Sequence, residues 1–586
     1  MTDSLFIFTF SPVQSFIAES RRADDLFTSS QILVKLAKAA AQAIQTSGGR
    51  LIYPAYTTVG DIPNRIVAII PTDQVKTIAR SAEVALKTCW SNIANAAKIS
   101  LTKLTPSDHI WNSIWDRQVD HFWEIYWAAV PKTTTGYRND MALVHAALDG
   151  VKRTRQFEAV EEDGPKDTLS GKRAALHTAS TSPTQYWTNI ASRIRNSRLR
   201  PNGRERLDAI GAIKRFWGDN TFPSTSTVAS LPFLEAVRKD PDALQKLRGY
   251  RDSIQTIGCF TVCEDPDWPF DGDLLFLDTL TEKRLQEDYF ITSISPDQFI
   301  NTRDRLKELY QHMKQSPSPY YALILMDGDN MGAKVVAYND ENESMRLSRD
   351  LSRFAQFVQG YQSRTATYAR VIYNGGDDLM ALVPLPYCLG FSRMMADNFN
   401  SLTSGTMSAG IAIGHHQYPL RAVIQAARDA ERNAKQVADN QKNAVCVMAL
   451  KRSGETRMAC SHWKDLDWVS PTDIPSPHLN RMDAVIEYLR SNRLSTNFAY
   501  TLEEESRVGT ALSDPAAQES LLKRLIKRHK TSALSDSDED SLRINLMDWV
   551  KGLNQTSNPI NSIPQGFAEL GIWMVIARFI AEGDKE

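Results

Sequence analysis

The sequence has few cysteines, no long hydrophobic run and almost no net charge. Its six cysteines are scattered over 586 residues, and the close pair Cys259 and Cys263 has no second pair with which to form a zinc site. We therefore expect reduced thiols in a cytoplasmic protein. No apolar run approaches the ~20 residues that cross a bilayer, so we expect no membrane contact. The net charge of −1 argues against binding nucleic acid through overall basicity. It leaves room for local basic patches and for contact mainly through partner subunits.

The length and the hydrophobic pattern predict several domains of α+β class. The first begins as a ferredoxin-like unit: a strand at 5–10, a long helix, strands at 50–53 and 65–70, and a helix from 73. Ser11 is the predicted N-cap of the first helix, with Pro12 at its first position. Residues 155–205 are polar and predict a loop or linker.

An aromatic stripe follows the first unit, with three- and four-residue steps. This spacing predicts the core face of a helix, although stacked nucleobases are the alternative. The stripe consists of Trp111, Trp115, Val119, Phe122, Trp123 and Tyr126.

A second ferredoxin-like unit begins at residue 320. Its predicted order is βαββαβ extended by one helix and one strand, with Ser344 capping its first helix. We expect a helical, polar region beyond residue 455. The predicted domains are 1–155 (first palm with a helical extension), 156–315 (mainly helical), 316–455 (catalytic palm) and 456–586 (helical).

Carboxylates mark the strand ends of this second unit. Asp327 ends the buried strand YYALILM, and Asp377 and Asp378 follow the turn NGG fifty positions later. In a ferredoxin-like sheet the first strand lies beside the hairpin, so these places can meet. Clustered carboxylates repel one another and need a cation, and their oxygens suit Mg²⁺ or Mn²⁺. Two such ions would serve transfer of a nucleotide to a 3′-hydroxyl.

Glycines around these aspartates fit a nucleotide site. Gly375 and Gly376 predict a tight hairpin turn with positive φ and room for a triphosphate, and Gly328 would do similar work beside Asp327. The alternative is a simple polar β-turn, which the neighbouring DGDN string disfavours.

Two further polar residues have two interpretations each. Lys435 could reach a triphosphate or pair with Glu431 one helical turn away. Ser408 could offer its hydroxyl to a base or ribose, or could be satisfied within the sheet. The basic run at 523–530 favours a solvated helix face over an RNA contact.

The motifs resemble the large subunit of type III-B CRISPR effector complexes, the Cmr complex. In the second half the similar strings are YYALILMDGDNMG, RVIYNGGDDLMALVP, MSAGIAIGHHQYPL, AARDAERNAK and KRSGE. In the first half they are FSPVQSFIAESRRADDL, IPNRIVA and ERLDAIGAIKRF. The resemblance implies two palms, of which only the second is catalytic. It also implies conversion of ATP to cyclic oligoadenylates when target RNA pairs with the guide RNA of the complex.

Two departures from that family remove activities. The chain has no His-Asp dipeptide, so we expect no HD-type nuclease activity. Where the family often has a Lys-Cys-x-x-Cys-Gly zinc loop, this chain has residues 166–171, KDTLSG. Zinc is therefore not expected there, and hydrogen bonds must hold the loop.

Our leading hypothesis from the sequence is an RNA-activated nucleotidyl transferase with Asp327, Asp377 and Asp378 as metal ligands. The nucleotide pocket would be shaped by Gly328, Asp329, Asn330, Gly375, Gly376, Ser408 and Lys435. The alternatives are a catalytically silent architectural subunit and a palm that adenylylates another small acceptor.

Overall fold

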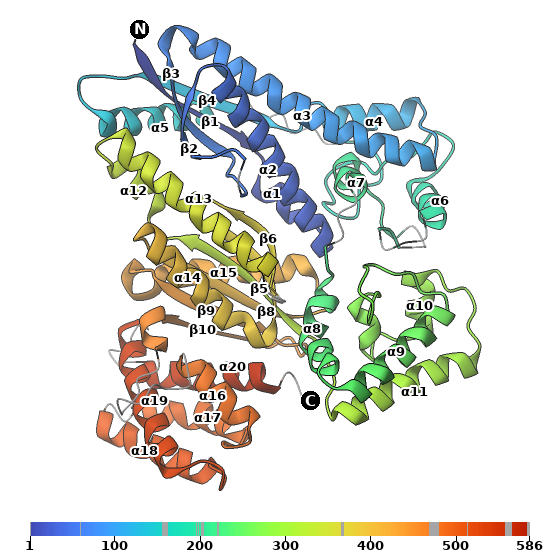
Figure 1. Ribbon diagram of the computed structural model, residues 1–586, viewed down its shortest axis with the longest axis vertical. Helices are drawn as coiled ribbons and strands as arrows, with labels where there is room; N and C mark the ends of the chain where they lie inside the picture. The colour runs from blue at the N-terminus through green and yellow to red at the C-terminus, as the bar shows by residue number, and fades with distance from the viewer. Residues whose placement is uncertain are drawn as a thin grey trace. The chain divides into compact units, whose positions relative to one another are not determined.

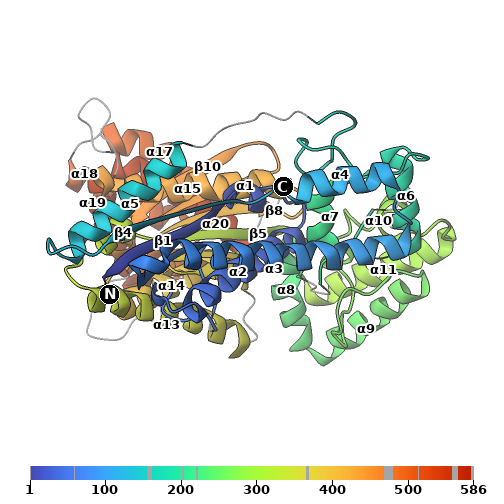
Figure 2. The same ribbon diagram turned by 90° about the horizontal axis from the view of Figure 1, so that it is seen from above.

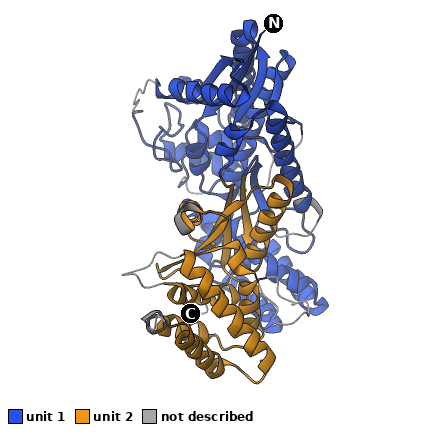
Figure 3. Ribbon diagram, turned by 90° about the vertical axis from the view of Figure 1, so that its left-hand side faces the viewer, with its two compact units in different colours: residues 1–317, 330–377, 419–421 blue, residues 318–329, 378–418, 422–586 orange. Residues whose placement is uncertain are grey.

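The computed structural model describes most of the chain. The described residues are 2–58, 60–154, 162–194, 196, 198–200, 204–218, 222–364, 369–467, 480–511, 514–556 and 565–582. They form two compact units (Figure 3): unit 1 comprises residues 1–317, 330–377 and 419–421, and unit 2 comprises 318–329, 378–418 and 422–586. The predicted catalytic range 316–455 is thus divided between both units. The predicted domain boundaries stay predictions.

The first palm has the predicted ferredoxin-like order. Its strands form a sheet of order β2-β3-β1-β4, in which β1 pairs antiparallel with both β3 and β4. Helices α2 and α3 lie side by side against it (Figures 1 and 2). The elements are β1 (Asp3–Ser11), α1 (Gln14–Ala18), α2 (Ala23–Thr46), β2 (Arg50–Tyr53), β3 (Arg65–Pro71), α3 (Val75–Leu104), α4 (His109–Val119) and β4 (Glu124–Pro131).

Both faces of the first sheet are covered. Successive side chains of β1 point to opposite faces of the sheet, and the strand is apolar on both. Phe6, Phe8 and Phe10 join a core with α2 and α3. Leu5 and Ile7 join a second core with α5 (Tyr137–Arg153). The second core also takes side chains from α12 (Met331–Ala337) and α13 (Glu341–Arg364), so these helices pack on the first palm within unit 1.

Some local predictions for the first half were wrong. Helix α4 ends at Val119, so Phe122 and Trp123 of the aromatic stripe lie in the connection after it and Tyr126 lies in β4, the fourth strand of the palm. Aromatic residues are common in strands, so their spacing alone did not show where the helix ends. Ser11 is the last residue of β1 and not a cap, and the loop predicted for 155–205 contains α6 (Pro183–Ile194).

The remaining elements of unit 1 include a helical region with its own core. After α7 (Ala209–Phe216), this region consists of α8 (Thr225–Arg238), α9 (Pro241–Thr256), α10 (Glu282–Tyr289) and α11 (Pro296–Met313). Buried side chains from these helices form one hydrophobic cluster. This agrees with the mainly helical segment predicted before residue 315.

The second palm has the same topology with two added strands. Its sheet order is β10-β9-β8-β5-β7-β6, so β8-β5-β7-β6 repeats the order β4-β1-β3-β2 of the first palm. The α+β class with two ferredoxin-like units is confirmed. The elements are β5 (Tyr320–Gly328), β6 (Arg370–Gly375), β7 (Asp378–Pro384), α14 (Cys388–Thr403), β8 (Met407–His415), α15 (Leu420–Asn440), β9 (Ala444–Leu450) and β10 (Thr456–His462), with α12 and α13 between β5 and β6.

Two details of this half also differ from prediction. Strand β10 pairs antiparallel with β9 and extends the sheet, where only helices were expected. Without β10, β9 would be an edge strand with unpaired backbone groups. Ser344 lies inside α13, which begins at Glu341, and its side chain is buried. Helices α16 (Arg481–Arg490), α17 (Asn497–Ala511), α18 (Pro515–His529), α19 (Asp536–Thr556) and α20 (Gly566–Glu582) follow.

No helix in the described part of the chain is both long enough and apolar enough to span a membrane. The most apolar one, α20, is instead packed against α17 and α19 in unit 2. The basic run 523–530 falls largely on α18.

A buried charge network joins distant segments of unit 1. The guanidinium of Arg215 donates to Asp25 Oδ2 at 3.0 Å and to Glu205 Oε1 at 3.1 Å, and Arg22 donates to Glu205 Oε2 at 2.7 Å. Burial raises the pKa of the Glu205 carboxyl, but the charges of Arg215 and Arg22 outweigh it and hold that pKa well below its usual range. Buried charges of this kind are tolerated only while they are paired.

Replacing Arg215 by leucine should strongly destabilise unit 1. Arg215→Leu would leave Asp25 and Glu205 buried without their main cation, at a cost of about 3–5 kcal/mol. Urea unfolding measures this free energy. The control is Arg204→Leu, which removes an ion pair to Glu287 whose arginine is half-exposed and should cost little. Equal effects of the two substitutions would contradict the importance of the network.

Candidate active site in the second palm

The end of β5 brings the first predicted aspartate beside its neighbours. In the antiparallel register, Asp327 is the partner of Asp378 on β7 and of Ser408 on β8. Because β5 is paired on both sides, a register shift of one residue would turn every side chain of the strand to the opposite face of the sheet. Asp327 and Asp378 therefore lie opposite each other at one end of their paired strands, as the sequence predicted.

A lysine from α15 reaches Asp327. Lys435 Nζ donates to Asp327 Oδ2 and also lies 2.5 Å from Glu431 Oε1, one turn earlier on the helix. Burial lowers the pKa of the Lys435 ammonium, but the hydrogen bonds that it donates to both carboxylates outweigh this and raise that pKa above its ordinary value. Lys435 is thus a permanent cation at this site. Of its two interpretations the structure shows the pair with Glu431, and the contact with a triphosphate stays a prediction.

A glycine in β8 lets α15 come this close. A Cβ on Gly410 would lie 2.2 Å from the backbone nitrogen of Glu431 and 2.4 Å from the carbonyl oxygen of Ala427. Any side chain at this position would push the helix away from the sheet. Gly410 therefore sets the distance at which the next turn of the helix presents Lys435 to Asp327.

The hairpin turn differs in detail from the prediction. Gly375 is the last residue of β6, and only Gly376 has a positive φ, of 71°. The turn itself is formed by Gly376 and Asp377, and Asp378 is exposed as the first residue of β7. Gly375 is constrained in another way, because a Cβ there would lie 2.2 Å from Tyr373 Oη.

Asp329 is a buried acceptor of three hydrogen bonds. It receives them from Ser408 Oγ at 2.7 Å, from Thr406 Oγ1 at 2.8 Å and from the backbone N–H of Asn443 at 3.0 Å. The Ser408 side chain is fully buried. Of its two interpretations, the structure shows the satisfied hydroxyl, and Asp329 ties the end of β5 to β8 and to the loop after α15.

The other predicted pocket residues lie near the chain turn after β5. Gly328 ends the strand, and Asn330 is exposed with a left-handed φ of 58° at the start of α12. Their nucleotide contacts, and those of Gly375, Gly376 and Lys435, stay predictions.

The donor set at the end of β5 suits a hard divalent cation. Asp327 and its register partner Asp378 offer only carboxylate oxygens, and Asp377 is adjacent in the chain; Mg²⁺ and Mn²⁺ prefer such ligands. Among the described residues, however, no three or more His, Cys, Asp or Glu side chains are grouped closely enough to hold a metal ion. Lys435 occupies Asp327 instead, so a cation would have to displace the ammonium.

Hydrogen bonds hold the loop that takes the place of the family's zinc loop. Asp167 Oδ2 accepts from the backbone N–H groups of Leu169 at 2.8 Å and Ser170 at 2.7 Å, and Oδ1 accepts from Ser170 Oγ at 2.6 Å. Hydrogen bonds hold this loop, as the sequence predicted. The absence of zinc from the protein stays a prediction.

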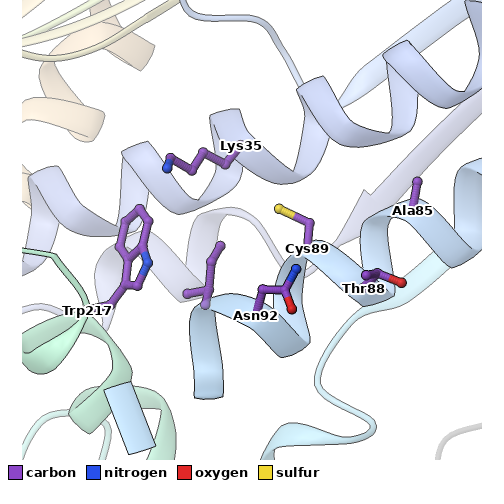
Figure 4. A pocket seen from close by; sticks show the side chains of 7 residues that line it. Lys35, Ala85, Thr88, Cys89, Asn92 and Trp217 are labelled. Carbon is purple, nitrogen blue, oxygen red and sulfur yellow. The ribbon is translucent and has the colours of Figure 1, made fainter. Parts of the chain in front are cut away.

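A separate pocket in unit 1 has a different character (Figure 4). It encloses about 480 Å³ between α2, α3 and Trp217, and Lys35 Nζ lies 5.1 Å from the centre of the Trp217 ring. No carboxylate lines it, so it lacks the groups needed for metal-assisted transfer. Its lining consists of Lys35, Ala85, Thr88, Cys89, Asn92, Ile93 and Trp217.

Sequence reasoning missed the residues that support this site. Thr406 and Asn443 donate hydrogen bonds to Asp329 but belong to no sequence motif of their own. Gly410 is one of 28 glycines, so its residue type alone does not mark it. Only the small residues in the string MSAGIAIG gave a signal, because a glycine within a buried strand marks a close backbone approach.

Removing the Asp329 carboxylate should loosen unit 2. Asp329→Ala leaves three donors without their acceptor in a buried place, which should lower the free energy of unfolding by about 2–4 kcal/mol. Ser408→Ala removes one donor with its proton and should cost about 1 kcal/mol. Thermal and urea unfolding measure both variants. A loss for Asp329→Ala no larger than that for Ser408→Ala would contradict the anchoring role.

Comparison with known proteins gives matches in both palms. Residues 320–446 match the family model of the Cas10/Cmr2 second palm domain, and residues 5–95 match that of the N-terminal region of the CRISPR-associated protein Cmr2. The Cmr subunit Cmr2 of Pyrococcus furiosus is 28% identical over 195 residues, which cover 28% of this chain and 22% of that protein. The match therefore spans less than a quarter of that relative.

Solved structures agree in fold. A type III-B Cmr-beta structure in the apo state has a TM-score of 0.70 and 13% identity, covering 99% of this chain and 82% of that one. A type III-B Cmr-beta structure bound to cognate target RNA has a TM-score of 0.66 and 14% identity, covering 99% and 83%. The resemblance to the large subunit of type III-B CRISPR effector complexes is therefore confirmed, carried by the Cmr2-type N-terminal region and the Cas10/Cmr2 second palm.

Proposed function

We propose that this chain is the large subunit of a type III-B CRISPR complex and converts ATP into cyclic oligoadenylates. The observation that carries the proposal is the register pair of Asp327 and Asp378 at the sheet edge, with the Lys435 ammonium on Asp327. A scaffold has no evident need to gather carboxylates at a strand end, because each must be kept apart from the others or neutralised.

The residues divide the work as follows. Asp327, Asp377 and Asp378 would hold Mg²⁺ or Mn²⁺, which when bound activates a ribose 3′-hydroxyl and stabilises the leaving pyrophosphate. That hydroxyl attacks the α-phosphorus of a second ATP, and the α–β phosphoanhydride bond breaks. Lys435 has the reach and the permanent charge to neutralise a triphosphate once it leaves Asp327. Glu431 keeps the ammonium nearby in either position.

The partners follow from the family and from the charge of the chain. We infer that the protein assembles with the other Cmr subunits around guide RNA, and that target RNA switches the palm on. The related structure bound to cognate target RNA supports this inference. With a net charge of −1, the chain is suited to meet RNA mainly through those subunits.

The double substitution Asp377→Ala with Asp378→Ala should abolish oligoadenylate formation. The assembled complex would be incubated with ATP, Mn²⁺ or Mg²⁺ and target RNA, and its products would be identified by mass spectrometry. Asp397→Ala is the matched control, because this carboxylate of α14 is exposed and forms an ion pair with Arg393. Unchanged product in the double variant would refute the assignment.

The same experiment separates the alternatives. An architectural subunit would bind ATP without turnover, and a palm with another acceptor would yield an adenylylated small molecule in place of oligoadenylates.

Lys435→Met should weaken use of ATP more than it weakens folding. Loss of one cation from a triphosphate site should raise KM for ATP by about tenfold or more, whereas Lys435→Arg should retain part of the affinity. Steady-state kinetics at saturating Mn²⁺ would measure both variants. A KM equal to that of the unmodified protein in Lys435→Met would show that the lysine serves only its contacts with Asp327 and Glu431.

A further inference from the structure

The connection between β2 and β3 of the first palm lies against the turn that precedes the catalytic aspartates. Asp61 forms an isolated parallel bridge with Gly375, and its Oδ2 accepts a hydrogen bond from the backbone N–H of Asn374 at 3.3 Å. All of these residues belong to unit 1. The loop that contains Asp61 lies more than 300 residues earlier in the sequence and pairs with the last residues of β6.

Two close approaches accompany this bridge. A Cβ on Gly376 would lie 2.2 Å from Tyr53 Oη, so the hydroxyl end of Tyr53 lies close to the turn at Gly376. A Cβ on Gly60 would lie 3.1 Å from the Cβ of Ala355, so the same loop also packs on α13. The contact leaves no room for a side chain at position 376.

Asn374 receives support from both sides. Its side-chain Nδ2 donates to the carbonyl oxygen of Ala355 at 3.0 Å, while its backbone N–H is held by Asp61. The residue is 4% exposed, so water cannot easily replace either bond. Asn374 is therefore clamped between α13 and the loop of the first palm.

The first palm holds the neighbouring helices as well. Glu341, at the start of α13, pairs with Arg50 of β2 and with Lys132 just after β4. Val335 and Val336 of α12 and Met345 of α13 pack into the core on the outer face of the first sheet. The position of the turn is thus fixed by a continuous set of contacts from the first palm.

We propose that Asp61 is a positioning residue: through the backbone of Asn374 and Gly375 it lets the first palm set the geometry of the turn that carries Asp377 and Asp378. This deepens the proposed function, on which its catalytic consequence rests. A change in the first palm, such as one imposed by partner subunits, would reach the aspartates through this bridge. Asp61 itself does not touch the nucleotide.

The test compares three variants in the assembled complex with guide RNA, target RNA, ATP and Mn²⁺. In Asp61→Ala, kcat should fall by about tenfold, which corresponds to the free energy of one lost hydrogen bond to a charged acceptor. The KM for ATP should stay within about twofold. Asp61→Asn keeps an acceptor oxygen for the Asn374 N–H and should retain most of the activity. Asp73→Ala, an exposed carboxylate in the same palm, should behave like the unmodified protein.

Hydrogen–deuterium exchange provides a readout that does not depend on turnover. The peptide covering residues 370–380 should exchange faster in Asp61→Ala than in Asp61→Asn or Asp73→Ala, because the Asn374 amide loses its acceptor.

Unchanged exchange in Asp61→Ala would overturn the positioning role. An equal fall in kcat for the Ala and Asn variants would also overturn it, because the charge and not the hydrogen bond would then matter. A lack of product in the unmodified complex would refute the proposed function alone, since the exchange experiment would still decide the role of Asp61.

Discussion

The position of β5 in the middle of its sheet determines most of the candidate site. Strand β5 pairs with β7 on one side and with β8 on the other. This register places Asp327 opposite Asp378 of β7 and opposite Ser408 of β8. Asp327 therefore reaches the sheet edge together with Asp378 without any special loop conformation. The remaining parts of unit 2 act on this edge: Gly410 sets the approach of α15, and Asp329 joins the strand end to Thr406, Ser408 and Asn443.

The proposed function requires the charges at the end of β5 to be exchangeable. Two carboxylates placed opposite each other raise the free energy of the folded protein unless a cation lies between or beside them. Lys435 supplies that cation to Asp327, and Glu431 holds the other side of the ammonium. A divalent ion and a triphosphate would together restore the same balance, with the lysine moved from carboxylate to phosphate. Because Lys435 lies on a rigid helix and ends in a flexible stem, this exchange needs no movement of the backbone.

The sequence predicted the fold class, the two palms and the end of β5, because buried strands and helix faces have strong periodicity. It failed where one residue type suits two structures. Tyr126 continues a helical spacing into β4, and Gly375 and Gly376 both look like turn residues although only Gly376 has a positive φ. It also could not show to which acceptor the Ser408 hydroxyl would donate, because that acceptor, Asp329, is brought there by strand pairing. The contact between Asp61 and Asn374 joins residues 313 positions apart and depends on how the palms pack, for which no local pattern exists.

The two palms use the same topological position for different purposes. In the second palm the last register pair between the first strand and the hairpin is Asp327 with Asp378; in the first palm the corresponding pair is Thr9 with Arg65. A threonine and an arginine offer no carboxylate oxygens, so the first palm has no counterpart of this carboxylate pair at the end of its paired strands. Its hairpin connection is instead long, running from Tyr53 to Arg65, and it reaches the short turn of the second palm at Asn374, Gly375 and Gly376. This connection carries Asp61 and is long enough to contact a neighbouring turn. Under the proposed function, the first palm therefore supports the turn that carries Asp377 and is more than an inactive copy of the second.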